Sequence, residues 1–267
     1  MSRLAIVIVS YNARADLERC LASLTAAPPA DAEIVVVDNQ SSDGSREAVS
    51  AFPQVRLLPQ TSNRGFSAGN NVGIRATSSE LLLLLNSDTV VPPGAIDRLV
   101  ATLDAHPDIA VVGPRLVDGQ GRPELSFGDM LGPAVEWRRR RLMRRLAADD
   151  AASWAEVQRL TAETQRPDWV TAACLLVRRV DAEAIGLLDE RFEMYTEDVD
   201  FCASIRARGR GILFTPAVEI VHLRGRSGAA QPAATRARYE RSHLAFYRKH
   251  RPWLAPLVWL YHRCRRR

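Results

Sequence analysis

An acidic segment at residues 195–200, Tyr-Thr-Glu-Asp-Val-Asp, holds the side chains best suited to acid–base chemistry. It opens a helix that we expect over residues 197–209, with Gly209 at the C-terminal end. Helix N-termini favour ionised carboxylates, so capping of this helix is the structural alternative for Glu197 and Asp198. A carboxylate held beside a substrate hydroxyl can instead serve as a general base. The segment is therefore a candidate for a catalytic carboxylate.

Polar side chains also stand at the ends of four expected strands. In an open α/β sheet, ligands bind beyond the carboxyl ends of the strands. Asx turns, helix caps or a hydrogen-bonded histidine would explain each group singly, but together they predict one binding edge. The groups are Ser10-Tyr11-Asn12, residues 38–45 beginning with Asp38, Asn86-Ser87-Asp88, and His222.

Two common nucleotide-binding motifs are missing from the sequence. No GxGxxG follows the first expected strand, which argues against a dinucleotide oxidoreductase, and no GxxxxGK[ST] indicates a P-loop NTPase. Gly65, Gly69 and Gly73 are spaced by four, which suits either close packing of a helix or a place near ligand phosphates or ribose. The four cysteines form no CxxC pair, which argues against a zinc site or a disulfide framework and fits a reducing compartment.

The elements that must position these groups alternate along the first 117 residues. Such alternation predicts a parallel, doubly wound sheet. After an irregular stretch we expect a strand at 169–179, the helix at 197–209, a strand at 212–223 and a basic amphipathic helix at 233–250. The earlier strands are expected at residues 4–10, 33–39, 55–59, 80–86 and 109–117, and the helices at 15–24, 45–52, 68–76 and 94–105.

The length of 267 residues, with 46% hydrophobic and 25% charged residues, allows one large α/β domain or two small ones. We expect one half at residues 1–117 and a second half of the same domain at 118–230, with a partly helical, mobile insertion at 124–166. A basic amphipathic extension is expected at 231–267. The N-terminus reads as a core strand, and no stretch approaches the roughly 20 apolar residues of a spanning helix. We therefore expect a soluble or peripheral protein.

The ordered series of segments resembles family 2 glycosyltransferases with the GT-A fold, in particular their bacterial rhamnosyltransferase-like branch. The resemblance implies a Rossmann-like, mostly parallel sheet flanked by helices, and a metal-dependent inverting transferase. It covers nearly the whole chain except the 124–166 insertion and the C-terminal tail. The matching segments are residues 7–12, 36–45, 63–74, 84–89, 169–179, 189–208 and 222–227.

The resemblance implies a binding site for a nucleotide-sugar donor at the first strand ends. Ser10, Asn12 and Asp38 would hold the base and ribose, with Arg64 near the base. A carboxylate can accept the ring N–H of uracil or thymine, so Asp38 makes a pyrimidine donor plausible.

The same resemblance implies a divalent cation, Mg²⁺ or Mn²⁺. Asn86-Ser87-Asp88 stands where the family has Asp-x-Asp, so Asp88 would bind the metal and Asn86 leaves one carboxylate fewer. His222 resembles the further metal ligand, while Arg224 and Arg226 are candidates for neutralising the leaving diphosphate.

Acceptor chemistry falls on the acidic segment. By resemblance Asp198 takes the proton of the acceptor hydroxyl, Glu197 is its neighbour, and Asp200 anchors locally. Trp169 is either core packing or an acceptor platform. Ala172 stands where relatives often have glycine, which would narrow the approach of a ligand at this edge.

Arginine clusters at residues 138–145 and 236–267 contribute to the net charge of +5. Interleaved Trp and Leu suit an anionic membrane surface, and relatives often use lipid-linked acceptors, so we expect a cytoplasmic enzyme that is peripheral at the inner face of the plasma membrane. A solvated basic face is the alternative. Nucleic acid is disfavoured because the sequence contains no known DNA- or RNA-binding module.

The favoured function is inverting transfer of a sugar, with rhamnose from dTDP-rhamnose as first choice, to a lipid-linked or polysaccharide acceptor in cell-envelope glycan synthesis. A UDP-hexose- or GDP-sugar-using transferase of the same fold is the alternative. A sugar-nucleotide nucleotidyltransferase would need a glycine-rich, basic loop after the first strand, which Ser10-Tyr11-Asn12-Ala13 is not. The candidates Asp88, Asp198 and His222 argue against a non-catalytic binding protein.

Overall fold

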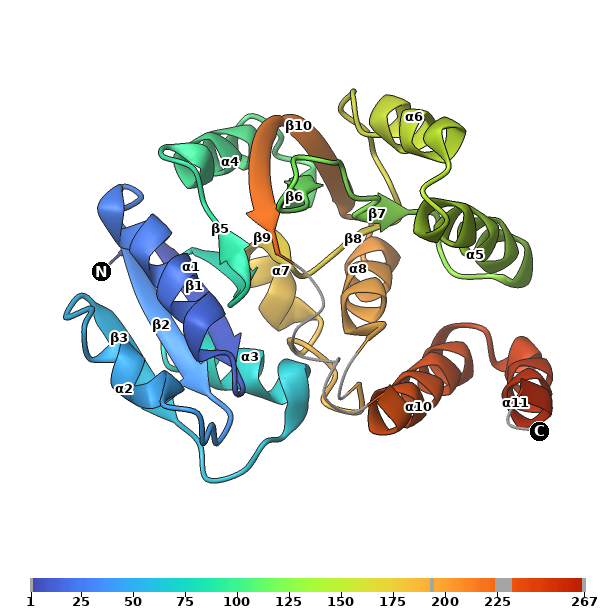
Figure 1. Ribbon diagram of the computed structural model, residues 1–267, viewed down its shortest axis with the longest axis horizontal. Helices are drawn as coiled ribbons and strands as arrows, with labels where there is room; N and C mark the ends of the chain where they lie inside the picture. Colours follow the sequence, from blue (N-terminus) through green and yellow to red (C-terminus); the bar gives the residue numbers. More distant parts are fainter. Residues whose placement is uncertain (1, 193–194, 224–231, 266–267) are drawn as a thin grey trace.

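An eight-stranded sheet forms the centre of the computed structural model, which describes residues 2–192, 195–223 and 232–265 (Figure 1). Its strand order is β3-β2-β1-β4-β9-β6-β10-β5. Neighbours are parallel except β9, which is antiparallel to β4 and β6, and β5, which is antiparallel to β10. The predicted mostly parallel α/β sheet is therefore confirmed. Its strands are β1 (Leu4–Ser10), β2 (Ala32–Asp38), β3 (Val55–Pro59), β4 (Leu81–Asn86), β5 (Thr89–Val90), β6 (Ile109–Val117), β9 (Cys174–Arg178) and β10 (Gly211–His222).

Helices cover both faces of this sheet because successive strand residues point to opposite sides. Along β1, Ala5 and Val7 belong to one apolar core, while Ile6 and Ile8 belong to the other. The first core is covered by α3 (Gly65–Arg75), α7 (Arg179–Ala184), α8 (Glu197–Ala207) and α10 (Pro232–His250), and the second by α1 (Arg14–Ala26), α2 (Ser45–Val49) and α4 (Ala95–Asp104).

Two glycines let α3 lie directly on β1. A Cβ atom would stand 2.8 Å from Val9 Cγ1 at Gly69 and 2.4 Å from Val7 Cγ1 at Gly73. Neither distance is compatible with a side chain unless the helix moves away from the strand. Of the two interpretations of the glycine spacing, close packing is thus the one that the structure supports at these positions.

The prediction of a single strand over residues 169–179 is wrong, because two separate strands occupy this range. β8 (Trp169–Val170) pairs with β7 (Phe127–Gly128) in a separate two-stranded sheet, whereas β9 runs in the main sheet. Between them, the Thr171 amide donates to the Ser126 carbonyl at 2.8 Å, and the Ala173 carbonyl accepts from the Asn86 amide at 2.9 Å. The chain crosses from one sheet to the other here, and both strands are buried, so the apolar pattern shows no break.

The predicted insertion at 124–166 contains two helices, α5 (Pro133–Ala147) and α6 (Ala151–Leu160). Its helical part is as expected, and its mobility stays a prediction. The C-terminal extension consists of α10, a 3₁₀ turn at Pro252–Leu254, and α11 (Ala255–Arg265). Figure 1 shows α5, α10 and α11 on the same side of the molecule. Within the described ranges, no helix has the length and apolar character needed to cross a membrane.

Candidate active site

The carboxyl ends of β1, β2 and β4 meet at one edge of the sheet, as predicted. Ser10 pairs with Asp38, and Val9 pairs with Asn86. Ser10 and Asp38 are buried, yet Ser10 Oγ and Asp38 Oδ1 have no hydrogen-bond partner among the described residues. A buried polar atom without a partner costs free energy, so these two oxygens indicate a ligand that would pair with them.

The turns after β1 and β2 hold this edge in shape. Asp38 Oδ2 accepts from the Ser41 amide at 3.1 Å and from Arg46 Nε, which leaves Oδ1 for a ligand. Asn12 lies in the left-handed region with φ 48°. The side-chain Oδ1 of Asn12 accepts from the Ser42 backbone amide at 2.8 Å, and the Asn12 backbone amide donates to Ser41 Oγ at 2.9 Å. The two turns therefore form one hydrogen-bonded unit.

Arg64, which the sequence places near the base, is engaged by Glu190. Arg64 Nη2 lies 2.7 Å from Glu190 Oε2. Glu190 also accepts from Asn71 Nδ2 at 3.1 Å and faces Arg75 Nη1 at 3.5 Å. These contacts tie the start of α3 to the segment before α8, and a place for Arg64 beside the base stays a prediction.

Asp88 and His222 come together through the pairing of β5 with β10. His222 Nε2 lies 3.3 Å from Asp88 Oδ1 and 3.4 Å from Asn86 Nδ2. A carboxylate oxygen and an imidazole nitrogen that face the same point are donors that Mg²⁺ or Mn²⁺ accepts. The described part of the chain contains no group of three or more His, Cys, Asp or Glu side chains around one such point. The pair therefore fits a cation that takes its other ligands from substrate oxygens or water.

Glu124 is a residue of this site that the sequence did not reveal. It is buried, and its Oε2 lies 3.1 Å from His222 Nδ1, on the side of the ring opposite Asp88. Metal-binding histidines commonly place the second ring nitrogen on a carboxylate, which orients the ring. Burial alone would lower the pKa of His222, but the hydrogen bonds to Asp88 and Glu124 outweigh it and raise that pKa to about 9. No motif surrounds Glu124, so no signal in the sequence could have found it.

The acidic segment forms the first turn of α8, as predicted. Tyr195 and Thr196 both have left-handed backbone angles, with φ of 66° and 61°, and turn the chain sharply into the helix. Asp198 Oδ1 accepts from the Val199 amide at 2.8 Å, and Oδ2 accepts from the Ala172 amide at 3.3 Å. The backbone amide of Ala172 thus helps to orient the Asp198 side chain.

The two neighbouring carboxyl groups differ in their surroundings. Burial raises the pKa of Glu197, and the charge of Asp198 raises it further; Glu197 Oε2 has no partner among the described residues. Burial also raises the pKa of Asp198, while the amides of Val199 and Ala172 oppose that shift. Groups with raised pKa values in a pocket are candidates for proton transfer near neutral pH, unlike the solvated acids of a helix cap.

A pocket of about 590 Å³ extends from the first turn of α8 to His222. Asp198, His222, Glu124 and Trp169 all line it. Trp169 is only 5% exposed and donates from Nε1 to the Asp129 carbonyl at 3.0 Å. The indole therefore packs in the core, and its contact with an acceptor stays a prediction. Residues 224 and 226, the two arginines expected to help the leaving diphosphate, lie outside the described residues.

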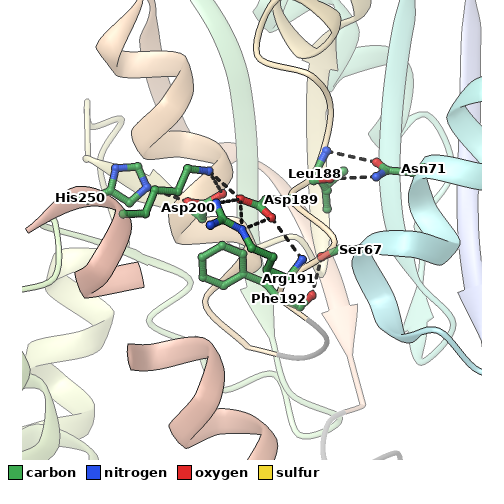
Figure 2. A network of polar contacts seen from close by, with 9 residues as sticks. Ser67, Asn71, Leu188, Asp189, Arg191, Phe192, Asp200 and His250 are labelled. Atoms are coloured by element: carbon green, nitrogen blue, oxygen red, sulfur yellow. Dashed lines mark hydrogen bonds and ion pairs between the residues drawn. The ribbon is translucent and has the colours of Figure 1, made fainter. Parts of the chain in front are cut away.

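Polar contacts from α3 hold the segment that leads into α8 (Figure 2). Ser67 Oγ donates to the Phe192 carbonyl at 2.7 Å. Asn71 Nδ2 donates to the Leu188 carbonyl at 2.8 Å, and the Leu188 amide donates back to Asn71 Oδ1 at 3.1 Å. These bonds fix the segment at two points close to the first turn of α8.

Asp200 bonds α8 to the end of α10. The sequence had predicted that Asp200 would anchor locally, but its partners are distant along the chain. Asp200 Oδ2 accepts from Lys249 Nζ at 2.8 Å, and Oδ1 lies 2.6 Å from His250 Nε2. Lys249 Nζ also lies 3.0 Å from Asp189 Oδ2. The C-terminal extension is thus bonded to the helix turn that carries Asp198.

Comparisons with known proteins show which family and which fold this chain is similar to. The model of glycosyl transferase family 2 matches residues 5–155. An N-acetylglucosaminyl-diphospho-decaprenol L-rhamnosyltransferase of Mycobacterium tuberculosis is 30% identical over 96% of this chain and 88% of its own length. The low-salt glycan biosynthesis hexosyltransferase Agl10 of Haloferax volcanii is 28% identical over 82% of this chain and 66% of its own. The fold is similar to the mannosyltransferase PcManGT from Pyrobaculum calidifontis, solved with GDP-Man and Mn²⁺ (TM-score 0.65, 20% identity, 96% of this chain and 68% of that one).

Proposed function

Because this chain belongs to glycosyl transferase family 2, we propose that it transfers a sugar from a nucleotide diphosphate to a lipid-linked acceptor, with inversion at the anomeric carbon. The observation that carries the proposal is that Asp198 and His222 line the same pocket. It would bring an acceptor hydroxyl at Asp198 close to a donor diphosphate at the Asp88–His222 pair. The setting is cell-envelope glycan synthesis.

The donor is recognised by the unpaired oxygens at the ends of β1 and β2. Asp38 Oδ1 would accept the ring N–H of a pyrimidine base, and Ser10 Oγ lies on the neighbouring strand. The first-choice donor is dTDP-rhamnose, because the similar protein of Mycobacterium tuberculosis is named a rhamnosyltransferase. UDP-hexoses and GDP-sugars are the alternatives.

A divalent cation, Mg²⁺ or Mn²⁺, would be held by Asp88 and His222. Bound there, it would supply positive charge for the diphosphate as that group departs. Glu124 keeps the ring of His222 turned toward Asp88.

Asp198 accepts the acceptor proton. As the hydroxyl oxygen bonds to the anomeric carbon, the bond from that carbon to the diphosphate oxygen breaks, and the proton passes to the Asp198 carboxylate. One carboxylate suffices for this displacement, since no covalent sugar–enzyme intermediate is needed. Burial raises the pKa of both carboxyl groups, and the charge of Asp198 raises that of Glu197 further. Asp198 accepts hydrogen bonds from the backbone amides of Val199 and Ala172, which favour its charged form, so we assign the base to Asp198.

The exposed side chains of the 3₁₀ turn at Pro252–Leu254 and of α11 fit an anionic membrane surface. Trp253 is 71% exposed and Leu257 63%, and Trp259 and Leu260 are also exposed. The guanidinium of Arg263 lies over the Trp259 ring at 5.2 Å, and α11 contains no acidic residue. Aromatic and aliphatic groups interleaved with arginine suit the cytoplasmic leaflet. Flotation of the protein with anionic vesicles at low salt tests this docking. If the protein does not float with the vesicles, the basic residues form a solvated face and not a membrane-binding surface.

A donor panel tests the enzymatic proposal. Binding of dTDP-rhamnose, UDP-sugars and GDP-sugars is measured with and without Mn²⁺, together with hydrolysis. One donor should bind in a metal-dependent way and be slowly hydrolysed. Absence of binding by every member, with or without Mn²⁺, would refute the proposal.

A further inference from the structure

One wall of the pocket has no part in the chemistry described above. This wall is α5, whose residues Arg139, Arg140, Met143, Arg144 and Ala147 line the pocket. The other four follow Arg139 by one, four, five and eight positions, which places all five on a single face of the helix. The face combines three guanidinium groups with apolar side chains and with the Glu136 carboxylate, which Arg140 holds, in the pocket that Asp198 also lines.

Two of these arginines are held by the protein itself. The guanidinium of Arg139 lies over the Trp169 ring at 4.7 Å. Arg140 Nη2 donates to Glu136 Oε2 and Nη1 donates to Tyr261 Oη, both at 2.6 Å. These bonds join α5 to α11 and fix Arg140 at the pocket wall.

Arg144 differs from both. Its side chain is exposed at the pocket, one helical turn after Arg140, and no ion pair or hydrogen bond holds its guanidinium within the described ranges. The adjacent Arg145, by contrast, is paired with Asp150 at 2.8 Å and does not line the pocket. An unpaired guanidinium beside a second, fixed one is suited to a phosphate group.

The rest of this wall is apolar. Leu131, Met143, Ala147 and Trp169 surround the arginines. A ligand that satisfies all of these groups has a hydroxyl for Asp198, an anion, and an apolar portion. An acceptor sugar carried on a lipid phosphate or diphosphate has this composition.

We propose that Arg144, supported by Arg140, binds the phosphate or diphosphate of the lipid-linked acceptor while the acceptor hydroxyl faces Asp198. This subsite is separate from the donor diphosphate, which belongs at Asp88 and His222. The proposal rests on the proposed function and adds to it the residue that distinguishes phosphate-linked acceptors from other sugars.

The test uses two soluble acceptor analogues with the same sugar and the same short alkyl chain, one joined through a diphosphate and one as a plain glycoside. In Arg144→Ala, KM for the diphosphate analogue should rise about 10- to 100-fold, the factor expected for one lost charge-assisted hydrogen bond. The KM for the donor, the kcat and the KM for the plain glycoside should stay unchanged, and Arg144→Lys should recover part of the loss. Arg141→Ala is the matched control, because Arg141 lies on the same helix over Trp137 and does not line the pocket.

Each other outcome overturns the assignment. An equal loss with both analogues would mean that Arg144 only shapes the pocket. A rise in donor KM alone would mean that Arg144 binds the donor diphosphate. Calorimetric titration of each analogue without donor gives the same comparison independently of turnover, so failure of the wild-type protein to transfer any sugar would count against the proposed function and not against this subsite.

Discussion

Replacing Asp200 with asparagine should loosen the catalytic helix from the C-terminal extension. The Asp200 side chain is 3% exposed and contacts the ammonium of Lys249, Nζ at 2.8 Å, and the imidazole of His250, Nε2 at 2.6 Å. Asparagine keeps the size of the side chain and removes the charge. It therefore tests the ion pairs and not the packing.

The structure sets the magnitude of the effect. Removal of one partner from a fully buried ion pair costs about 3–5 kcal/mol. Lys249 keeps Asp189 at 3.0 Å, and the side chains of Lys249 and His250 are 29% and 21% exposed, so solvent reduces the loss. We expect about 2 kcal/mol, which for a chain of this size lowers Tm by about 4–8 °C.

The same substitution should lower the rate of transfer. Asp198 lies two residues before Asp200 in the first turn of α8, and a displacement of about 1 Å in a reacting group can cost about 100-fold in rate. We expect kcat to fall about 10- to 100-fold. Donor affinity should be unchanged, because Asp38 and Asp88 lie on other elements.

The assay combines thermal unfolding, steady-state kinetics and donor titration. Arg248→Ala is the control, since it removes a cation next to Lys249 that contacts neither Asp189 nor Asp200 among the described residues. A cycle with Lys249→Met should give a coupling energy of about 0.5–3 kcal/mol. If Asp200→Asn melts and turns over like the Arg248 control, and the cycle shows no coupling, the C-terminal extension does not position the catalytic turn.

Three further outcomes are expected. Gly73→Ala should lower the free energy of unfolding by about 1–3 kcal/mol in chemical denaturation, because the new Cβ would stand 2.4 Å from Val7 Cγ1; unchanged stability would contradict the close packing of α3 on β1. The kcat/KM should rise with pH through a pKa above the usual aspartate value of about 4, since burial raises the pKa of Asp198 and the base acts only when deprotonated; a flat profile from pH 4 upward would speak against this role. Glu124→Gln should weaken Mn²⁺ binding about 10- to 100-fold in a spectroscopic titration, because Glu124 orients His222; equal affinity would remove it from the site.

The part of the site that could be predicted from the sequence is the part that topology dictates. Ser10, Asp38 and Asn86 each end a buried strand, and parallel strands place their carboxyl ends at one edge. The strand ends also placed Asp88 and His222 at this edge, but their role as metal ligands came from resemblance alone, since 134 positions separate them and β5 is only two residues long. Local pattern could therefore identify the binding edge but not the chemistry of the Asp88–His222 pair.

The remainder depends on contacts that no local pattern carries. Glu124 reaches His222 only because the chain turns back after β6, and an isolated glutamate in an irregular stretch looks like any surface acid. Asp200 was expected to bond nearby, yet its partners lie 49 and 50 positions away on α10. The division of residues 169–179 into two strands could not be predicted, because both strands are buried and apolar. The break between them places the Ala172 amide beside Asp198.

Asp198 is proposed as the base that accepts the acceptor proton. The most direct measurement compares Asp198→Asn with the unaltered protein, scoring donor binding by calorimetry with Mn²⁺ present and sugar transfer by product formation. We predict the same donor affinity and transfer slowed by about 100- to 10,000-fold. Full transfer by Asp198→Asn, with the donor bound as before, would contradict the claim.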